Sequence, residues 1–214
     1  MRFLKQARAG TPRISIESVQ RFRPTERVIN PRRGDFVLTH GSQWTSWLIR
    51  AGQALRYYGD SHKYTYWNHA AIFSDDAGHI IEALGAGVVE RHISVYDPAD
   101  YHVVFLRMAD LDRDQVVEFA RYSRDHQYGY LTIVSLTLSL ATGSKLSFGV
   151  DGQETCSGLV ARALERAGEI FPEEPWHATP AGLAKFYGVN PPSDAGGHVR
   201  PAGAPDQSQK PAAA

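Results

Sequence analysis

The stretch that decides the fold is Glu154-Thr-Cys-Ser-Gly-Leu-Val-Ala-Arg-Ala-Leu-Glu-Arg-Ala-Gly168. Its apolar residues recur at helical spacing and form one stripe, while most of its charged residues point away from that stripe. Thr155 is a good N-cap and Gly168 stands where a C-terminal cap belongs, so the pattern predicts an amphipathic helix that begins at Cys156. At that position, unpaired backbone N–H groups and the positive end of the helix dipole favour a thiolate.

Cys156 is the only cysteine among 214 residues, which excludes an internal disulfide and a metal site made of several thiolates. A lone cysteine is either a small buried hydrophobe or a reagent. Lys and Arg balance Asp and Glu, 23 against 23, so the net charge would not recruit nucleic acid or a membrane surface. We therefore expect no nucleic-acid partner.

Five short runs ahead of the cysteine helix favour β-strands: residues 34–40, 68–73, 79–84, 88–93 and 102–106. The second and third runs flank Ser-Asp-Asp-Ala-Gly, a cluster of turn-forming residues, and together they predict a hairpin. Apolar spacing predicts helices over 44–55, over 112–124 with an Asp cap, and over 130–141, where a strand is the alternative. The whole pattern indicates an α+β domain with a mainly antiparallel sheet.

The run Cys156-Ser-Gly-Leu-Val160, opening a helix that ends in glycine, resembles the nucleophile helix of the NlpC-type cell-wall peptidases. Ordinary members place the cysteine before the histidine, whereas here every plausible histidine strand precedes the cysteine. That order is similar to the permuted branch, the YiiX-like papain-like amidases and their lecithin:retinol acyltransferase relatives. Arg33-Gly-Asp-Phe-Val-Leu38 and Trp67-Asn-His-Ala-Ala-Ile-Phe73, followed by Ile-Ile-Glu-Ala, fit the same order. The resemblance covers about residues 33–190 and implies a permuted papain-like (NlpC-type) fold, its antiparallel sheet packed against the cysteine helix.

The resemblance implies a Cys-His-Glu catalytic triad, with Cys156 as nucleophile, His69 as base and Glu82 as the group that orients the histidine. Strand geometry bears on the third member, because residues directly or diagonally opposite in a hairpin share a face. A loop of two or four residues puts Glu82 on the face of His69. A loop of three residues without a bulge puts His79 there, so His79 is the alternative.

A thioester mechanism also needs donors for the oxyanion. We expect the backbone N–H of Cys156 to be one, and the candidates for the second are Tyr128, Tyr130 and Ser157. Trp67, two residues before His69, is a core residue by type and a candidate for one wall of the cleft.

The other polar residues of note fit structural or surface roles. For Asp35, which follows a glycine ahead of a strand, a turn role is favoured over a catalytic one. The remaining histidines share no metal-ligand spacing, so we expect most of them at the surface, with no metal and no cofactor: His40, His62, His92, His102, His126 and His177.

The resemblance implies a thiol hydrolase, an amidase, peptidase (thiol protease) or esterase, that forms an acyl-thioester. Its substrate would be a small-molecule, peptide or lipid-like acyl compound. One alternative is an acyltransferase that passes the acyl group to an acceptor other than water, and another is a catalytically inactive binding module. A glutamate in the third position favours the hydrolase, since the acyltransferase relatives resemble one another in having a second histidine there.

Composition divides the chain into a basic N-terminal arm over 1–32, a catalytic domain over 33–190 and a disordered Pro/Gly/Ala-rich tail over 191–214. We expect the arm to be solvated, with a contact surface for phosphates or an acidic partner as the alternative. The start has no apolar signal-like stretch, and the apolar run 130–141 is too short to be a transmembrane segment. We therefore expect a cytoplasmic protein, delivered elsewhere only by a non-Sec route.

Overall fold

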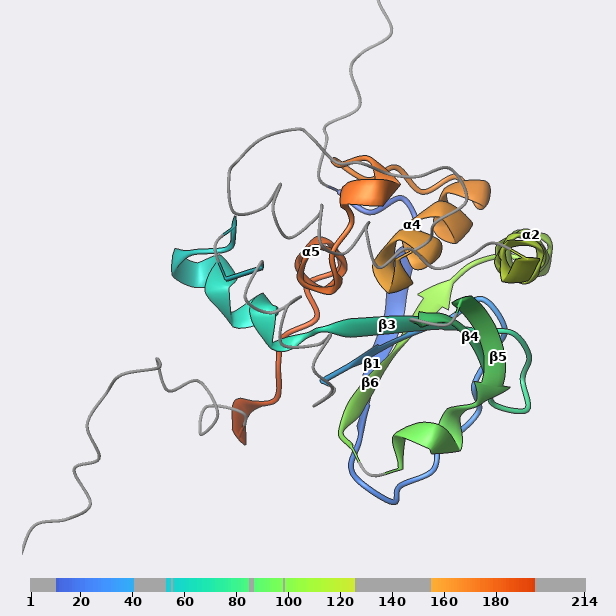
Figure 1. Cartoon of the computed structure of the whole chain (residues 1–214), viewed down its shortest axis with the longest axis horizontal. Helices are drawn as coiled ribbons and strands as arrows, with labels where there is room; N and C mark the ends of the chain where they lie inside the picture. The colour runs from blue at the N-terminus through green and yellow to red at the C-terminus, as the bar shows by residue number, and fades with distance from the viewer. Residues whose placement is uncertain are drawn as a thin grey trace, which may run out of the picture.

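The computed structural model describes residues 11–40, 53–54, 56–84, 87–97, 99–125 and 155–194 (Figure 1). They form a mixed α+β structure around a six-stranded sheet with strand order β1-β6-β2-β3-β4-β5, in which each pairing is antiparallel. The predicted α+β class and antiparallel sheet are confirmed.

The strands are β1 (Ser15–Phe22), β2 (Phe36–Thr39), β3 (His69–Phe73), β4 (His79–Leu84), β5 (Gly87–His92) and β6 (Tyr101–Arg107). The α-helices include α2 (Asp110–Tyr122), α4 (Cys156–Arg166) and α5 (Pro180–Phe186). Short 3-10 helices complete the described part: η1 (Gly59–Tyr66), η2 (Ile93–Tyr96), η3 (Ser123–Asp125) and η4 (Pro175–His177).

The sheet is curved, and a separate apolar cluster covers each of its faces. Helices α2, α4 and α5 lie over one face, whereas η2 lies on the concave side (Figure 1). Because side chains alternate along a strand, Ala70 and Ile72 of β3 join the core beneath the helices, while Ala71 and Phe73 join the concave cluster. The sheet thus has a buried interior on both sides.

Helix α4 begins and ends where the sequence predicted. Thr155 Oγ1 accepts a hydrogen bond from the backbone N–H of Gly158 at 3.0 Å, which caps the N-terminus. A Cβ at Gly158 would lie 2.6 Å from that oxygen, so only glycine fits this first turn. At the other end Gly168 has φ 85°, and the N–H groups of Gly168 and Glu169 bond the carbonyls of Glu165 and Leu164. These caps make Cys156 the first helical residue.

The turn between β3 and β4 has four residues, 75–78. Ile72 pairs with Ile81 and Phe73 with Ile80, and the N–H of Ser74 bonds the carbonyl of His79 at 2.8 Å. The predicted hairpin is confirmed, and its register is the four-residue alternative.

Residues 15–22, predicted as part of a solvated arm, instead form β1, which pairs along its length with β6. The register shifts between Ile16 and Ser18, and the strand lies at the sheet edge, so its sequence shows no clean alternation. Two of the basic residues of this region pair with carboxylates of the same chain, Arg21 with Asp100 and Arg32 with Glu17. The expectation of an arm up to residue 32 is therefore wrong for this stretch.

Two smaller expectations differ from the structure. Helix α2 begins at Asp110 after Ala109, and no side chain caps it, so the predicted Asp cap is wrong and the acidic residues lie within the first turn. Asp35 does sit in a turn, its N–H bonding the carbonyl of Arg32, yet its carboxylate is also buried in an ion pair with Arg113 at 2.9 Å. The predicted helix over 130–141 and residues 44–52 and 55 of the predicted helix 44–55 lie outside the described residues, and residues 53–54 are helical as predicted.

Candidate active site

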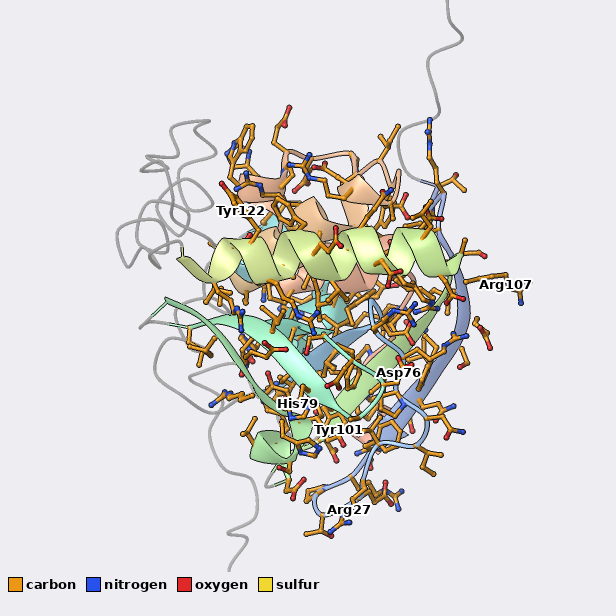
Figure 2. The ribbon with its side chains drawn as sticks, turned by 90° about the vertical axis from the view of Figure 1, so that its right-hand side faces the viewer. Arg27, Asp76, His79, Tyr101, Arg107 and Tyr122 are labelled. Carbon is orange, nitrogen blue, oxygen red and sulfur yellow. The ribbon has the colours of Figure 1, made fainter. Side chains whose placement is uncertain are left out.

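His69 and Glu82 meet on the concave face of the sheet. His69 is the first residue of β3, and the hairpin register places Glu82 diagonally across from it on the same face. The Nε2 atom of His69 lies 2.5 Å from Glu82 Oε2. The alternative, His79, is not brought to His69: labelled in Figure 2, it lies at the exposed turn end of β4, its Nδ1 2.7 Å from Asp75 Oδ2.

Cys156 reaches the same histidine from helix α4. Its side chain is hydrogen-bonded to His69, and the backbone N–H groups of Ala70 and Ser157 also donate to the sulfur. Since Nε2 of the ring faces Glu82, Nδ1 is the ring nitrogen left for the thiol. Cys156 is 2% exposed and the His69 side chain 16% exposed, so the pair is shielded from bulk water while the imidazole remains in reach of solvent.

The surroundings favour a thiolate and an imidazolium in this pair. Burial alone raises the pKa of the Cys156 thiol, but the positive charge and hydrogen bond of His69, with the two backbone donors, lower it overall. Burial likewise lowers the pKa of His69, and the charge and hydrogen bonds of Cys156 and then Glu82 outweigh it, raising that pKa to about 10. Each group thus holds the other in its charged form.

Glu82 is fully buried and accepts from three side chains. His69 and the Tyr96 hydroxyl both bond Oε2, the latter at 2.5 Å, and Arg91 Nε bonds Oε1. Burial by itself raises the pKa of Glu82, yet the His69, Arg91 and Tyr96 contacts lower it to about 2. The carboxylate is therefore ionised throughout the physiological range.

Arg91 and Tyr96 were missed by the sequence reasoning. Glu82 pairs with Val89 across β4 and β5, which puts Arg91 at the diagonal position on the same face. A strand pairing assigned between residues 79–84 and 88–93 would have found Arg91. Tyr96 comes from η2, and its local sequence carries no sign that its hydroxyl turns back to the sheet.

The other predicted site residues have different roles or lie outside the described residues. The Ser157 hydroxyl donates to the carbonyl of Ala178 at 2.7 Å, so it is not aimed at an oxyanion above Cys156. Trp67 is fully buried, and its Nε1 donates to the carbonyl of Val189 at 3.1 Å, so it is a core residue and not a wall of a cleft. Tyr128 and Tyr130 lie outside the described residues.

One of the remaining histidines, His102, is buried. His102 on β6 is 7% exposed and packs edge-on against Trp67, with ring centroids 4.7 Å apart. Burial, and then the charge of Arg21, lower its pKa to about 4, so the ring is neutral near pH 7. In the part of the chain that the structure describes, no three His, Cys, Asp or Glu side chains are arranged to hold a metal ion.

In those same described ranges, every helix is too short or too polar to cross a membrane. No protein-family model matches the chain, and a search of the curated proteins returns no match. The site consists of a thiol at a helix N-terminus, an imidazole hydrogen-bonded to it, and a buried ionised carboxylate behind the imidazole.

Proposed function

We propose that the protein is a cysteine hydrolase that cleaves amide or ester bonds through an acyl-thioester on Cys156. One observation carries the proposal: Cys156 begins helix α4 and is hydrogen-bonded to His69, whose other ring nitrogen lies 2.5 Å from the buried carboxylate of Glu82. A thiol, an imidazole and a carboxylate hydrogen-bonded in this order form the catalytic triad of nucleophilic thiol catalysis. A purely structural cysteine would have no need of it.

In the acylation half-reaction the Cys156 thiolate attacks the carbonyl carbon and forms a C–S bond. The backbone N–H of Cys156, at the helix N-terminus, would stabilise the oxyanion, and such a donor contributes about 3 kcal/mol. When the intermediate collapses and the C–N or C–O bond breaks, the His69 imidazolium gives its proton to the departing amine or alcohol. The products of this step are the free amine or alcohol, the thioester and neutral His69.

In the second half-reaction water attacks the thioester while His69 takes its proton. The C–S bond breaks, the acid leaves, and the thiolate–imidazolium pair is restored. Glu82 keeps the same ring orientation in both halves and stabilises the imidazolium, since it accepts from Nε2 and leaves Nδ1 to the sulfur. An acyltransferase would differ only in the molecule that accepts the acyl group. The resemblance favours water as the acceptor, because the third member of the triad is a carboxylate, whereas the acyltransferase relatives have a second histidine there.

The fold that we propose is the permuted papain-like (NlpC-type) one. It is supported by the order of the motifs along the chain: the strand after Asp35, the histidine strand with its glutamate partner, and last the cysteine helix packed on that sheet. The substrate class that fits this chemistry is an acyl amide or ester of a small molecule, a peptide or a lipid-like compound.

The test is to trap the intermediate. The protein would be incubated with a panel of p-nitrophenyl esters and peptide anilides, and intact-mass spectrometry would detect an acyl adduct on the single cysteine. We expect a burst of released nitrophenol and an adduct that Cys156→Ala lacks. Added alcohols and amines separate the two activities, because a hydrolase forms acid in their presence and an acyltransferase forms the new ester or amide. Equal turnover by Cys156→Ala would refute the proposal.

A further inference from the structure

We infer that Arg91 and Tyr96 are positioning residues of this site, which hold the Glu82 carboxylate ionised and turn one of its oxygens toward His69. The inference rests on the proposed function, because it assigns roles within the same triad. Neither residue is hydrogen-bonded to the Cys156 thiol. Both donate to Glu82 and act through it.

The need for such residues follows from the burial of Glu82. A carboxylate removed from water becomes neutral unless donors and a positive charge replace its hydration. Glu82 is fully buried, and a single imidazolium would leave its other oxygen without a partner. Arg91 fills that position from β5 with a charge-assisted hydrogen bond to Oε1, and its side chain is 37% exposed, so only one member of the pair is fully desolvated.

Tyr96 fixes the orientation of the carboxylate in addition to stabilising its charge. Its hydroxyl and His69 Nε2 both lie 2.5 Å from Oε2, so the same oxygen is defined by two donors from different elements. Rotation of the carboxylate would break both bonds at once. The Tyr96 ring is itself held between two other rings, with centroids 6.2 Å from His69 and 6.1 Å from Tyr101.

Helix η2, which carries Tyr96, is tied to the hairpin that carries His69 and Glu82. The N–H of Ile93 bonds the carbonyl of Gly78, the turn glycine between β3 and β4, at 2.9 Å. The end of η2 is held from the other side, where the N–H of Thr25 bonds the carbonyl of Asp97 at 2.8 Å. The hydroxyl of Tyr96 is therefore aimed before any substrate binds, as preorganised catalytic support requires.

Loss of these donors changes the pH at which the thiolate forms. Among the residues that the structure describes, the charged or titratable side chains that face Glu82 are His69 from β3, Arg91 from β5 and Tyr96 from η2, and Cys156 on α4 acts on it through His69. Without Arg91 or the Tyr96 hydroxyl, burial raises the pKa of Glu82. A carboxylate that has lost one of its donors is held less firmly toward His69 and stabilises the imidazolium less, so the thiolate appears only at higher pH.

The experiment measures the rate of iodoacetamide alkylation of Cys156 against pH in Arg91→Met and Tyr96→Phe. We expect the acid limb of the profile to move up by about one pH unit in each variant, the amount that one hydrogen bond to a charged group represents. Arg91→Lys keeps the charge and should recover much of the wild-type profile.

Matched controls remove the same chemical groups elsewhere. Tyr101→Phe deletes a hydroxyl in the same apolar cluster, one that donates to the carbonyl of Glu26 at 3.3 Å and is labelled in Figure 2. Arg124→Met deletes an exposed arginine that pairs with Glu90. Both should keep the wild-type profile, and thermal unfolding would show that every variant is folded.

A further measurement guards against variants that fold poorly. In Glu82→Gln the amide oxygen could still accept a hydrogen bond from His69, but the amide NH2 group would then face Arg91, and two donors would meet. Adding Arg91→Met should relieve that conflict. The double variant should therefore lose less alkylation rate than the two single losses predict together. If the wild-type thiol is activated but the variants show unshifted pH profiles and additive losses, the positioning roles of Arg91 and Tyr96 are overturned and the proposed function is not. An ordinary thiol in the wild type would instead overturn the proposed function.

Discussion

Two fully buried carboxylates, one just before β2 and one on β4, differ in their surroundings. Asp35, before β2, is bonded by Arg113 and by the N–H of Leu106 on one oxygen, while its other oxygen has only Arg32, at 3.5 Å. Burial outweighs these partners and raises the pKa of Asp35. Glu82 has side-chain donors on both oxygens, and its pKa is lowered to about 2.

The comparison shows what separates a structural ion pair from a site. Arg113 is 3% exposed in its side chain and joins Asp35 in tying helix α2 and the turn before β2 to β6. Glu82 faces a partly exposed imidazole that can exchange a proton with the thiol beside it. Both carboxylates are buried and have an arginine partner. Of the two, Glu82 is the one connected through an imidazole, His69, to a nucleophile, Cys156.

The largest expected effect is on turnover by the thiol–imidazole pair. Cys156→Ala and His69→Ala should each reduce activity by a factor on the order of 10⁴ or more, because the residues of a triad act as a unit. Steady-state assays on the best substrate of the panel would measure it, with circular dichroism to show that the fold is intact. Activity within a few-fold of wild type in either variant would contradict the assigned roles.

Neutralising the two carboxylates should then separate their functions. Glu82→Gln should lower turnover by less than His69→Ala, since a neutral amide oxygen can partly replace the orienting acceptor. Asp35→Asn should leave the alkylation rate of Cys156 unchanged and change the free energy of unfolding by only about 1 kcal/mol, because burial already favours the neutral form of this side chain. Urea unfolding and alkylation kinetics on both variants test this, and a reversed pattern would refute the distinction.

The pH dependence of stability should have opposite signs for the two carboxylates. The folded-state pKa of Glu82 is below its unfolded value, so its stabilisation is present above about pH 4.3 and is lost as the pH falls toward about 2. The folded-state pKa of Asp35 is above its unfolded value, so protonation favours the folded state and stability gains as the pH falls through that pKa. Subtracting the unfolding free energies of Glu82→Gln and Asp35→Asn from wild type between about pH 3 and 6 isolates each effect. Slopes of the same sign would contradict the account.

Local pattern was enough to place the cysteine helix and the histidine hairpin. Thr155, Gly158 and Gly168 determine the ends of α4 through caps and close approach, which are local effects. The turn-forming residues placed the hairpin, and two of the three turn lengths left open put Glu82 on the face of His69; the turn has four residues.

What the sequence could not supply depends on contacts between distant segments. Strand β1 is an edge strand with a register shift, so its pattern is hidden until β6 is beside it. Arg91 and Tyr96 reach Glu82 only after β5 has paired with β4 and η2 has turned back under the sheet. The hydroxyl of Ser157 is taken by Ala178, a partner 21 residues away.

The central claim is that Cys156 and His69 form an activated pair, and thiol reactivity tests it most directly. The alkylation rate of the single cysteine with iodoacetamide would be followed by mass spectrometry against pH in the wild type and in His69→Ala. The account predicts a rate that is already high near about pH 6 in the wild type and collapses in the variant. An ordinary profile centred near about pH 8.5 in both proteins would contradict it.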